Sequence, residues 1–142
     1  MIDRLTTSNT IQLLERVVNF TEQRHELILE NVANVSTPGY VQKDVNPRDF
    51  QQALADAATK RRQTFNGRID PASTDTVEFV SDSSTLRLKP QPVTTTAFHD
   101  GGVRSMEQLM TNLADNAQAH NLAATMLRSR YDGISKAISM KV

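Results

Sequence analysis

The chain has 142 residues, enough for one ordinary domain, and its 16 basic and 16 acidic side chains give a formal net charge of zero. This balance gives no long-range attraction to nucleic acid or anionic lipid, and the absence of cysteine excludes disulfides and thiolate chemistry. Apolar residues make up 38% of the chain, with no Trp, two Tyr and five Phe, which is little aromatic area for a self-contained core.

The N-terminal sequence MIDRLTTSNT lacks the apolar run of a cleavable secretory signal. No stretch of the sequence approaches the roughly 20 apolar residues that are needed to span a bilayer. If the protein acts outside the cytoplasm, we therefore expect it to leave by a route that needs no cleaved signal.

Residues 3 to 35 are predicted to form a long helix, because they contain neither Gly nor Pro and their apolar residues recur at helical spacing. At about 100° per residue these side chains spread over roughly 200°, whereas a surface helix needs a stripe only a little over about 100° wide. We therefore expect neighbours on two sides, although Thr21, Arg24 and His25 interrupt the wide face. The residues expected to form its packing interface are Leu13, Val17, Phe20, Leu27 and Ile28.

The sequence Thr37-Pro38-Gly39 is expected to stop this helix and turn the chain. A residue before proline avoids helical geometry, and glycine accepts the positive φ that the third position of a type II turn requires. On physical grounds alone the turn is as consistent with an ordinary helix stop as with a recognition element. Asn31 and Asn34 could simply fray the last helical turn.

The segment between the long helices is predicted to contain a short helix and a small hairpin. Residues 49 to 63 have a helix-forming composition, and residues 76 to 80 and 85 to 89 alternate apolar and polar side chains around a turn sequence. Pro90 and Pro92 are expected to end any strand. Because an isolated two-stranded ribbon is only marginally stable, this hairpin needs a surface to pack on.

A second long helix is predicted from about Val103 to Ile138, following the punctuation DGG. Its apolar positions alternate at spacings of 3 and 4 for about five heptads, which is typical of a coiled-coil seam. The seam is weak where Ala117, His120 and Ala124 bury little area, and His120 is better explained as a core histidine than as a ligand. The large seam residues expected to form the packing interface are Met106, Met110, Leu113, Leu127, Tyr131, Ile134 and Ile138.

These elements predict a mainly α fold with three regions. Residues 1 to 40 form the first helix and its turn motif, residues 41 to 102 a partly flexible linker with the short helix and β-hairpin, and residues 103 to 142 the second helix. The terminal helices are expected to pair as a coiled-coil-like hairpin and to form one helical domain. One such pair covers only about half of the apolar arc on the first helix, and soluble monomers rarely expose a large apolar flank. Self-assembly or a dedicated partner is therefore expected.

The sequence shows no pattern that is typical of a catalytic or cofactor site. His25, His99 and His120 are far apart and lack ligand spacing, and there is no Gly-rich phosphate loop or strand-turn-helix serine motif. The basic stretch TKRRQTFNGR is the best case for nucleic-acid binding, but at zero net charge a solvated loop or protein contact explains it better. We expect no enzymatic activity, no catalytic residue, no cofactor, no metal, no nucleic acid and no small-molecule substrate.

The sequence NVANVSTPGY resembles the N-terminal signature of the bacterial flagellar axial proteins, the family of rod and hook subunits. The surrounding sequence, about residues 1 to 54 and 100 to 140, is similar to the short, cell-proximal rod members. The segment between the helices is too short for the large domain of distal rod and hook subunits. The chain departs from the family pattern at Glu30 and at Asn46-Pro47. The residues that match the family's turn motif are Asn31, Ala33, Asn34, Thr37, Pro38, Gly39 and Tyr40.

The resemblance implies a structural subunit of the flagellar basal-body rod that stacks with other copies and with other rod subunits through its terminal helices. It implies contacts with the membrane-ring protein and its small adaptor, export through the type III gate and a place in the periplasm-spanning rod. It also implies that Asn31, Asn34 and Tyr40 lock the turn against a neighbour. The alternative that the sequence leaves open is a cytoplasmic coiled-coil adaptor or export chaperone that binds a partner helix.

Overall fold

The computed structural model describes residues 2–63, 69–80, 85–93 and 103–139. It is mainly helical, and the segment that joins the two long terminal helices in sequence contains small β-ribbons, so the predicted fold class is confirmed. The helices of the described ranges are α1 (Ile2–Ala33), α2 (Pro47–Gln63) and α3 (Val103–Ser139), and the strands are β1 (Lys43–Asp44), β2 (Val77–Phe79), β3 (Leu86–Leu88) and β4 (Gln91–Pro92). No helix within these ranges has an apolar stretch of the length and hydropathy that a membrane span requires.

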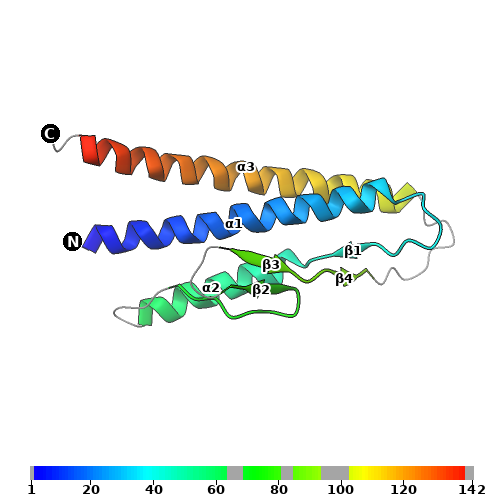
Figure 1. Cartoon of the computed structure of the whole chain (residues 1–142), viewed down its shortest axis with the longest axis horizontal. Helices are drawn as coiled ribbons and strands as arrows, with labels where there is room; N and C mark the ends of the chain where they lie inside the picture. The colour runs from blue at the N-terminus through cyan, green and yellow to red at the C-terminus, as the bar shows by residue number, and fades with distance from the viewer. Residues whose placement is uncertain (1, 64–68, 81–84, 94–102, 140–142) are drawn as a thin grey trace.

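α1 is the central element of the molecule. Figure 1 shows α3 running antiparallel along one side of α1, while α2 and the strands lie along the other side. The two chain termini therefore lie at the same end of the helix pair, and the turn that follows α1 lies at the opposite end. This arrangement gives α1 the two neighbours that its wide apolar arc predicts.

The second face of α1 is covered by the middle of the same chain. Phe20 of α1 stacks on Phe50 of α2 with ring centroids 4.0 Å apart, and Phe50 stacks on Phe79 of β2 at 6.0 Å. The expectation that a monomer leaves this flank exposed is therefore wrong, because a layer of modest apolar content is enough to cover it. The buried residues of this core are Phe20, Leu27, Val45, Phe50, Ala53, Leu54, Val77, Phe79 and Leu86.

Asn46 and Pro47, where the chain departs from the family pattern, begin α2. The side chain of Asn46 accepts a hydrogen bond from the Arg48 backbone N–H at 3.0 Å, which is the bond of a helix N-cap. Pro47 occupies the first helical position, where its missing N–H costs nothing. Asp49 then accepts from the Asn46 amide at 3.0 Å and from the Thr76 hydroxyl at 3.3 Å, which ties the start of α2 to the hairpin.

The predicted hairpin is present, with β2 and β3 antiparallel and Glu78 opposite Arg87. The outer edge of β3 is bonded to a side chain of α1: Gln23 donates to the Leu86 carbonyl at 2.8 Å and accepts from the Leu88 N–H at 3.3 Å. The surface that this ribbon needs is therefore α1 of the same chain.

Both prolines lie at strand ends as expected, since β3 ends at Leu88 before Pro90 and Pro92 is the last residue of β4, but β4 itself was not predicted. β4 pairs antiparallel with β1, with Pro92 opposite Lys43, and the Val93 N–H donates to the Gln42 carbonyl at 2.9 Å. A proline is tolerated here because it lies in a very short edge strand.

The contact between α1 and α3 uses a helix face rotated from the predicted seam. The most buried residues of α3 are Leu109, Asn116 and Ala123, which recur every seventh residue. The Asn116 side chain donates to the Thr21 carbonyl at 2.7 Å, and the Thr21 hydroxyl lies 3.0 Å from His120 Nδ1. Asn116, which is polar and hydrogen-bonded, lies at the centre of the contact. A prediction from apolar spacing alone therefore placed the packing face at a different rotation about the axis of α3.

We predict that Phe50→Ala lowers the free energy of unfolding by about 3 to 5 kcal/mol, because it removes the ring between two others in a dry core. Val80→Ala is the matched control, since Val80 is 46% exposed, and it should cost less than about 0.5 kcal/mol. Denaturant unfolding followed by circular dichroism measures both values. Equal effects of the two substitutions would show that α2 does not pack on α1.

Candidate functional site

The turn motif has the predicted backbone geometry. The Tyr40 N–H donates to the Thr37 carbonyl at 3.2 Å across the turn, and Gly39 has a φ of 78°. These values define a type II turn with glycine at its third position. Asn34 ends the preceding helix: its side-chain amide donates to the Glu30 carbonyl at 2.8 Å, and its own carbonyl accepts from the Thr37 N–H at 2.9 Å.

Asn31 joins the end of α1 to the returning chain. Its side-chain oxygen accepts from the Lys43 N–H and from the Tyr40 hydroxyl, both at 3.0 Å, and its amide nitrogen donates to the Lys43 carbonyl. Asn31 is 2% exposed, so both acceptor positions of its oxygen are used inside the chain. In this structure Asn31 and Tyr40 therefore lock the turn against β1 of their own chain. The solvent-exposed residues of the motif are Ala33, Thr37, Pro38 and Gly39.

A partly buried ion pair holds the same segment on α1, one residue beyond the Asn31 bonds. Arg24 donates from two nitrogens to the two oxygens of Asp44, each at 3.3 Å. The Arg24 side chain is 8% exposed and the Asp44 side chain 31% exposed, and Asp44 also accepts from the Val45 N–H at 2.7 Å. Arg24 therefore lies on the apolar face without being an unpaired buried charge, whose removal from water would be costly.

Tyr40 has an electrostatic environment that favours its neutral form. Partial burial raises the pKa of the Tyr40 phenol above its usual value, and the nearby Glu30 carboxylate raises it further. Only the neutral phenol can donate to Asn31, so this environment preserves the hydrogen bond that closes the turn.

The predicted interface residues of α1 are brought together in the structure. Phe20, Leu27 and Ile28 are at most 7% exposed, and Leu13 and Val17 pack partly buried against the core. On α3 the predicted residues divide into two groups. Met106, Leu113, Leu127 and Ile134 are half-buried, whereas Met110, Tyr131 and Ile138 are 44%, 49% and 68% exposed within this chain.

The exposed group includes the end of the predicted seam. Figure 1 shows α1 and α3 diverging toward the two termini, which leaves Tyr131 and Ile138 uncovered. The Tyr131 hydroxyl still reaches α1, where it donates to Glu15 at 2.8 Å, and this bond to a carboxylate raises the Tyr131 pKa. A packing role for these side chains in an assembly stays a prediction.

Several positioning residues were missed by the sequence analysis, although signals for some were present. Thr21 and Arg24 interrupt the wide apolar face, and the side chains of both make tertiary contacts: the Thr21 hydroxyl lies 3.0 Å from His120 Nδ1, and Arg24 donates to Asp44. Gln23 and Asn116 carried no such signal, because an isolated amide on a helix is most often solvated. Their roles depend on which segment lies opposite.

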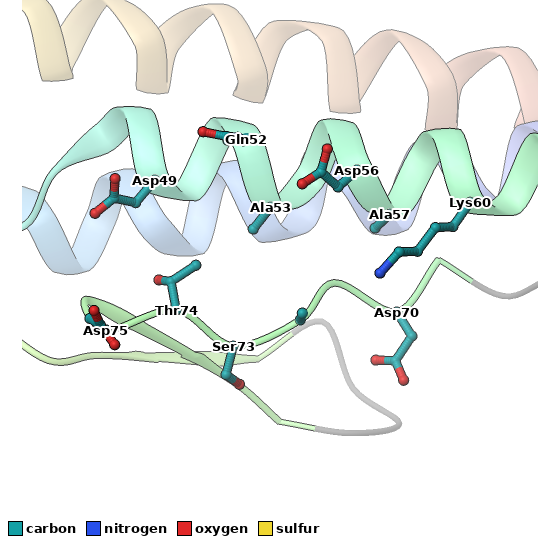
Figure 2. Close-up of a pocket in the computed structure, with 11 residues that line it drawn as sticks. Asp49, Gln52, Ala53, Asp56, Ala57, Lys60, Asp70, Ser73, Thr74 and Asp75 are labelled. Atoms are coloured by element: carbon teal, nitrogen blue, oxygen red, sulfur yellow. The ribbon is translucent and has the colours of Figure 1, made fainter.

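A shallow hollow of about 410 Å³ lies between α2 and residues 70 to 75. Figure 2 shows that its polar lining includes Asp49, Asp56, Asp70 and Asp75, with Lys60 at one end. None of its lining residues belongs to the turn motif or to the predicted interface. Within the described ranges, no three His, Asp or Glu side chains are grouped so that they could hold a metal ion.

The structure is an elongated antiparallel helix pair with a bonded turn at one end and exposed apolar side chains on α3 at the other. Comparisons with known proteins add to this description. No protein-family model matches the chain. The chain is 28% identical over 140 residues to the flagellar basal body rod protein FlgB of Salmonella typhimurium, with 94% of each chain covered.

Two further relatives carry the same description. The chain is 28% identical over 142 residues to the FlgB of Yersinia enterocolitica, covering 94% of this chain and 95% of that one. It is 25% identical over 141 residues to the FlgB of Escherichia coli, covering 94% of both. These relatives confirm the resemblance to the flagellar rod family, and within that family the resemblance is to the short proximal rod protein FlgB.

We predict that Gly39→Val destabilises the chain by about 1 to 3 kcal/mol, because a β-branched residue is strained at positive φ even where space is open. Gly133→Ala is the control, since Gly133 lies inside α3 with nothing within 4 Å, and it should stabilise by up to about 1 kcal/mol. Denaturant unfolding measures both. A stable Gly39→Val protein would contradict the turn geometry.

We also predict a pH dependence for the turn. Folding raises the Tyr40 pKa, so the stability that the phenol contributes is present below about pH 10 and is lost as the pH rises through the raised value. In a Tyr131→Phe background, Tyr40 is the remaining tyrosine, and phenolate absorbance should titrate above its usual value. Glu30→Gln should move the midpoint down by the smaller, charge-dependent part of the shift. A midpoint at or below the usual value would contradict the burial of Tyr40.

Proposed function

We propose that this chain is a structural, non-enzymatic subunit of the bacterial flagellar basal-body rod, which self-assembles through its terminal helices and joins the membrane ring to the more distal rod. The observation that carries the proposal is similarity over 94% of the chain to proteins described as flagellar basal body rod proteins. The proposed partners are other copies of the chain, other rod subunits, the membrane-ring protein with its small adaptor, and the export gate. We further propose that the chain is exported without a cleaved signal and acts in the periplasm-spanning rod.

The dimensions of the helices support a rod subunit. α1 has 32 residues and α3 has 37, so at about 1.5 Å per residue each is on the order of 50 Å long. Long helices in an assembled tube must keep their shape under load. The layer formed by α2 and the ribbons supports this requirement, because it braces the middle of α1 along the side opposite α3.

The exposed end of the helix pair supports assembly through the terminal helices. Tyr131 and Ile138 are 49% and 68% exposed at the end where α1 and α3 diverge. A neighbouring subunit that covers these side chains would gain the hydrophobic free energy that the isolated chain does not use. Contacts of this kind add little stability to one chain and much to a stack.

We predict that Leu127→Asp prevents rod assembly. Leu127 lies half-buried on the helix pair, where an unpaired carboxylate would cost several kcal/mol or separate the helices. Gln118→Asp is the control, because Gln118 is exposed on α3. The measurement is motility, together with electron microscopy of basal bodies, in a strain that lacks the chromosomal copy and expresses each variant.

Two results would contradict the proposed function. A strain without the chain that swims and builds complete rods would show that the chain is not a rod subunit. If the protein is found only in the cytoplasm, bound to a partner helix, and is absent from purified basal bodies, the alternative function is favoured, which is a coiled-coil adaptor or export chaperone. Normal rods with Leu127→Asp would show only that this side chain is not in a buried contact.

A further inference from the structure

α3 carries more apolar surface than α1 covers. The contact between the two helices is centred on Asn116, whereas the apolar positions that recur at spacings of 3 and 4 continue around one side of that contact. At about 100° per residue, Leu113 and Tyr131 lie roughly 60° from Asn116 in one direction around the axis of α3. Ala124 lies roughly 80° from Asn116 in the same direction. The apolar seam of α3 is therefore only partly used within the chain.

The Tyr131 hydroxyl shows on which side of the helix pair this surface lies. It donates to Glu15, which lies on the circumference of α1 roughly 120° from Thr21 and away from the middle layer. Val18 and Leu29 lie on the same side of α1, roughly 60° and 80° from Thr21. Apolar side chains of both helices therefore share the side of the pair that the middle layer leaves open.

This shared surface has the composition of a protein contact. Leu29, Met110 and Tyr131 are 45%, 44% and 49% exposed, while Glu22 of α1 and Arg128 of α3 lie at its edges. An apolar centre with a polar rim is typical of protein interfaces, and a heptad seam is the surface that a further helix packs on. We name this surface the outer face of the helix pair, and its members are Val18, Leu29, Met110, Leu113, Ala124 and Tyr131.

A second exposed stripe runs along the opposite side of α3. Leu122 and Met126 are 57% and 48% exposed, and they lie roughly 120° and 80° from Asn116 in the direction away from the outer face. The stripe spans roughly 80° of the helix circumference and contains no charged residue, and Arg130 and Lys136 lie just beyond its two edges. We name it the α3 ridge, and its members, all exposed, are Leu122, Met126, Ser129, Gly133 and Ala137.

The α3 ridge combines two large side chains with a flat region. A Cβ added at Gly133 would meet nothing within 4 Å, so the missing side chain makes room for no other part of the described chain. Glycine in a helix interior lowers helix stability, and its advantage is that another backbone can approach closely. Leu122 and Met126 would anchor such a neighbour, and the small residues would let it lie flat.

The outer face and the α3 ridge are suited to each other. They lie roughly 180° apart around α3, and neither has a charged residue among its members. On α3 the outer face extends over residues 110 to 131 and the ridge over residues 122 to 137, about 32 and about 23 Å at 1.5 Å per residue, so the ridge fits within the face. The outer face is also continuous with the contact between α1 and α3, which is already a contact between long helices.

We propose that the α3 ridge of one copy of this chain docks on the outer face of a second copy. The contact is heterologous, because each copy uses a different surface toward each of two neighbours. Since the two surfaces lie on opposite sides of α3, one copy can use both at once, and repetition of the contact builds an open stack. The inference rests on the proposed rod function and adds to it the two surfaces that meet.

Sedimentation velocity of the purified full-length chain, at concentrations up to about 1 mM, tests this pairing. Leu122→Glu/Met126→Glu places carboxylates on the ridge, and Leu29→Glu/Met110→Glu places them on the outer face. All four side chains are at least 44% exposed, so the fold should be kept, and circular dichroism checks this. Each variant alone should lose at least about tenfold of the wild-type association constant, because the contact would bury unpaired carboxylates.

A mixture of the two variants gives the sharper result. One chain then has an intact outer face and the other an intact ridge, so an equimolar mixture should associate again but stop at a dimer of one copy of each. The control variant is Ala114→Glu/Thr125→Glu, which adds two carboxylates at exposed positions of α3 that belong to neither surface and should associate like the wild type.

A second readout uses the absence of cysteine from the sequence. A Met126→Cys chain, mixed in turn with a Met110→Cys chain and an Ala124→Cys chain, should form a mixed disulfide dimer with at least one of them under mild oxidation. This dimer should form faster than the disulfide dimer of any of the three chains with itself.

The proposal is overturned if the wild-type chain does not associate, if the ridge and outer-face variants associate normally, or if their mixture does not form the dimer. It is also overturned if no mixed disulfide forms, or if Met110→Cys in basal bodies cross-links only to a different rod subunit. None of these outcomes affects the proposed function itself, because the deletion strain and the basal-body preparations test that separately.

Discussion

Side-chain amides of α1 bond to extended segments of the chain as a neighbouring strand would, and the arrangement of the middle of the molecule depends on this pairing. Gln23 donates to the Leu86 carbonyl and accepts from the Leu88 N–H, while Asn31 does the same with both backbone groups of Lys43. Short ribbons of this kind have open edges, and an unpaired backbone group that is removed from water costs about 1 to 3 kcal/mol. The amides supply these partners from a helix that is already rigid.

The hydrophobic core follows from this attachment. Once β1 and β3 are fixed on α1, Phe50 lies against Phe20 and Phe79 lies against Phe50, so the three rings form a continuous stack. The chain has few aromatic residues, and this stack places three of the five Phe side chains in one contact. The result is a braced helix: α3 covers one side of α1 and the middle layer covers the other, which suits a subunit that must keep its length in an assembly.

The features predicted from sequence are those that local chemistry determines. The two long helices, the type II turn at Pro38-Gly39 and the hairpin of β2 and β3 follow from periodicity, proline and glycine, and all three appear with closely similar bounds. The width of the apolar arc on α1 correctly predicted two neighbours. It could not show that the second neighbour is the middle of the same chain, because that depends on pairing between residues that are distant in sequence.

Two of the errors share a physical cause, which is that polar side chains decided the geometry. The predicted seam on α3 follows apolar spacing, whereas the observed face is centred on Asn116, whose amide bonds the Thr21 carbonyl. Asn31 was expected to contact a neighbour, and it bonds its own chain instead because the turn returns β1 to within hydrogen-bond distance. Composition shows that such groups are present, but only the fold shows which groups they meet.

Hydrogen exchange at two backbone amides tests the central claim most directly. The account predicts that the Lys43 and Leu88 N–H groups of the isolated full-length chain exchange at least about tenfold more slowly than in an unfolded peptide, because side chains of α1 bond both. Gln23→Ala should release Leu88 while Lys43 stays protected. Exchange of both amides at the unfolded rate, with the interior of α1 still protected, would show that the middle layer is not held on α1.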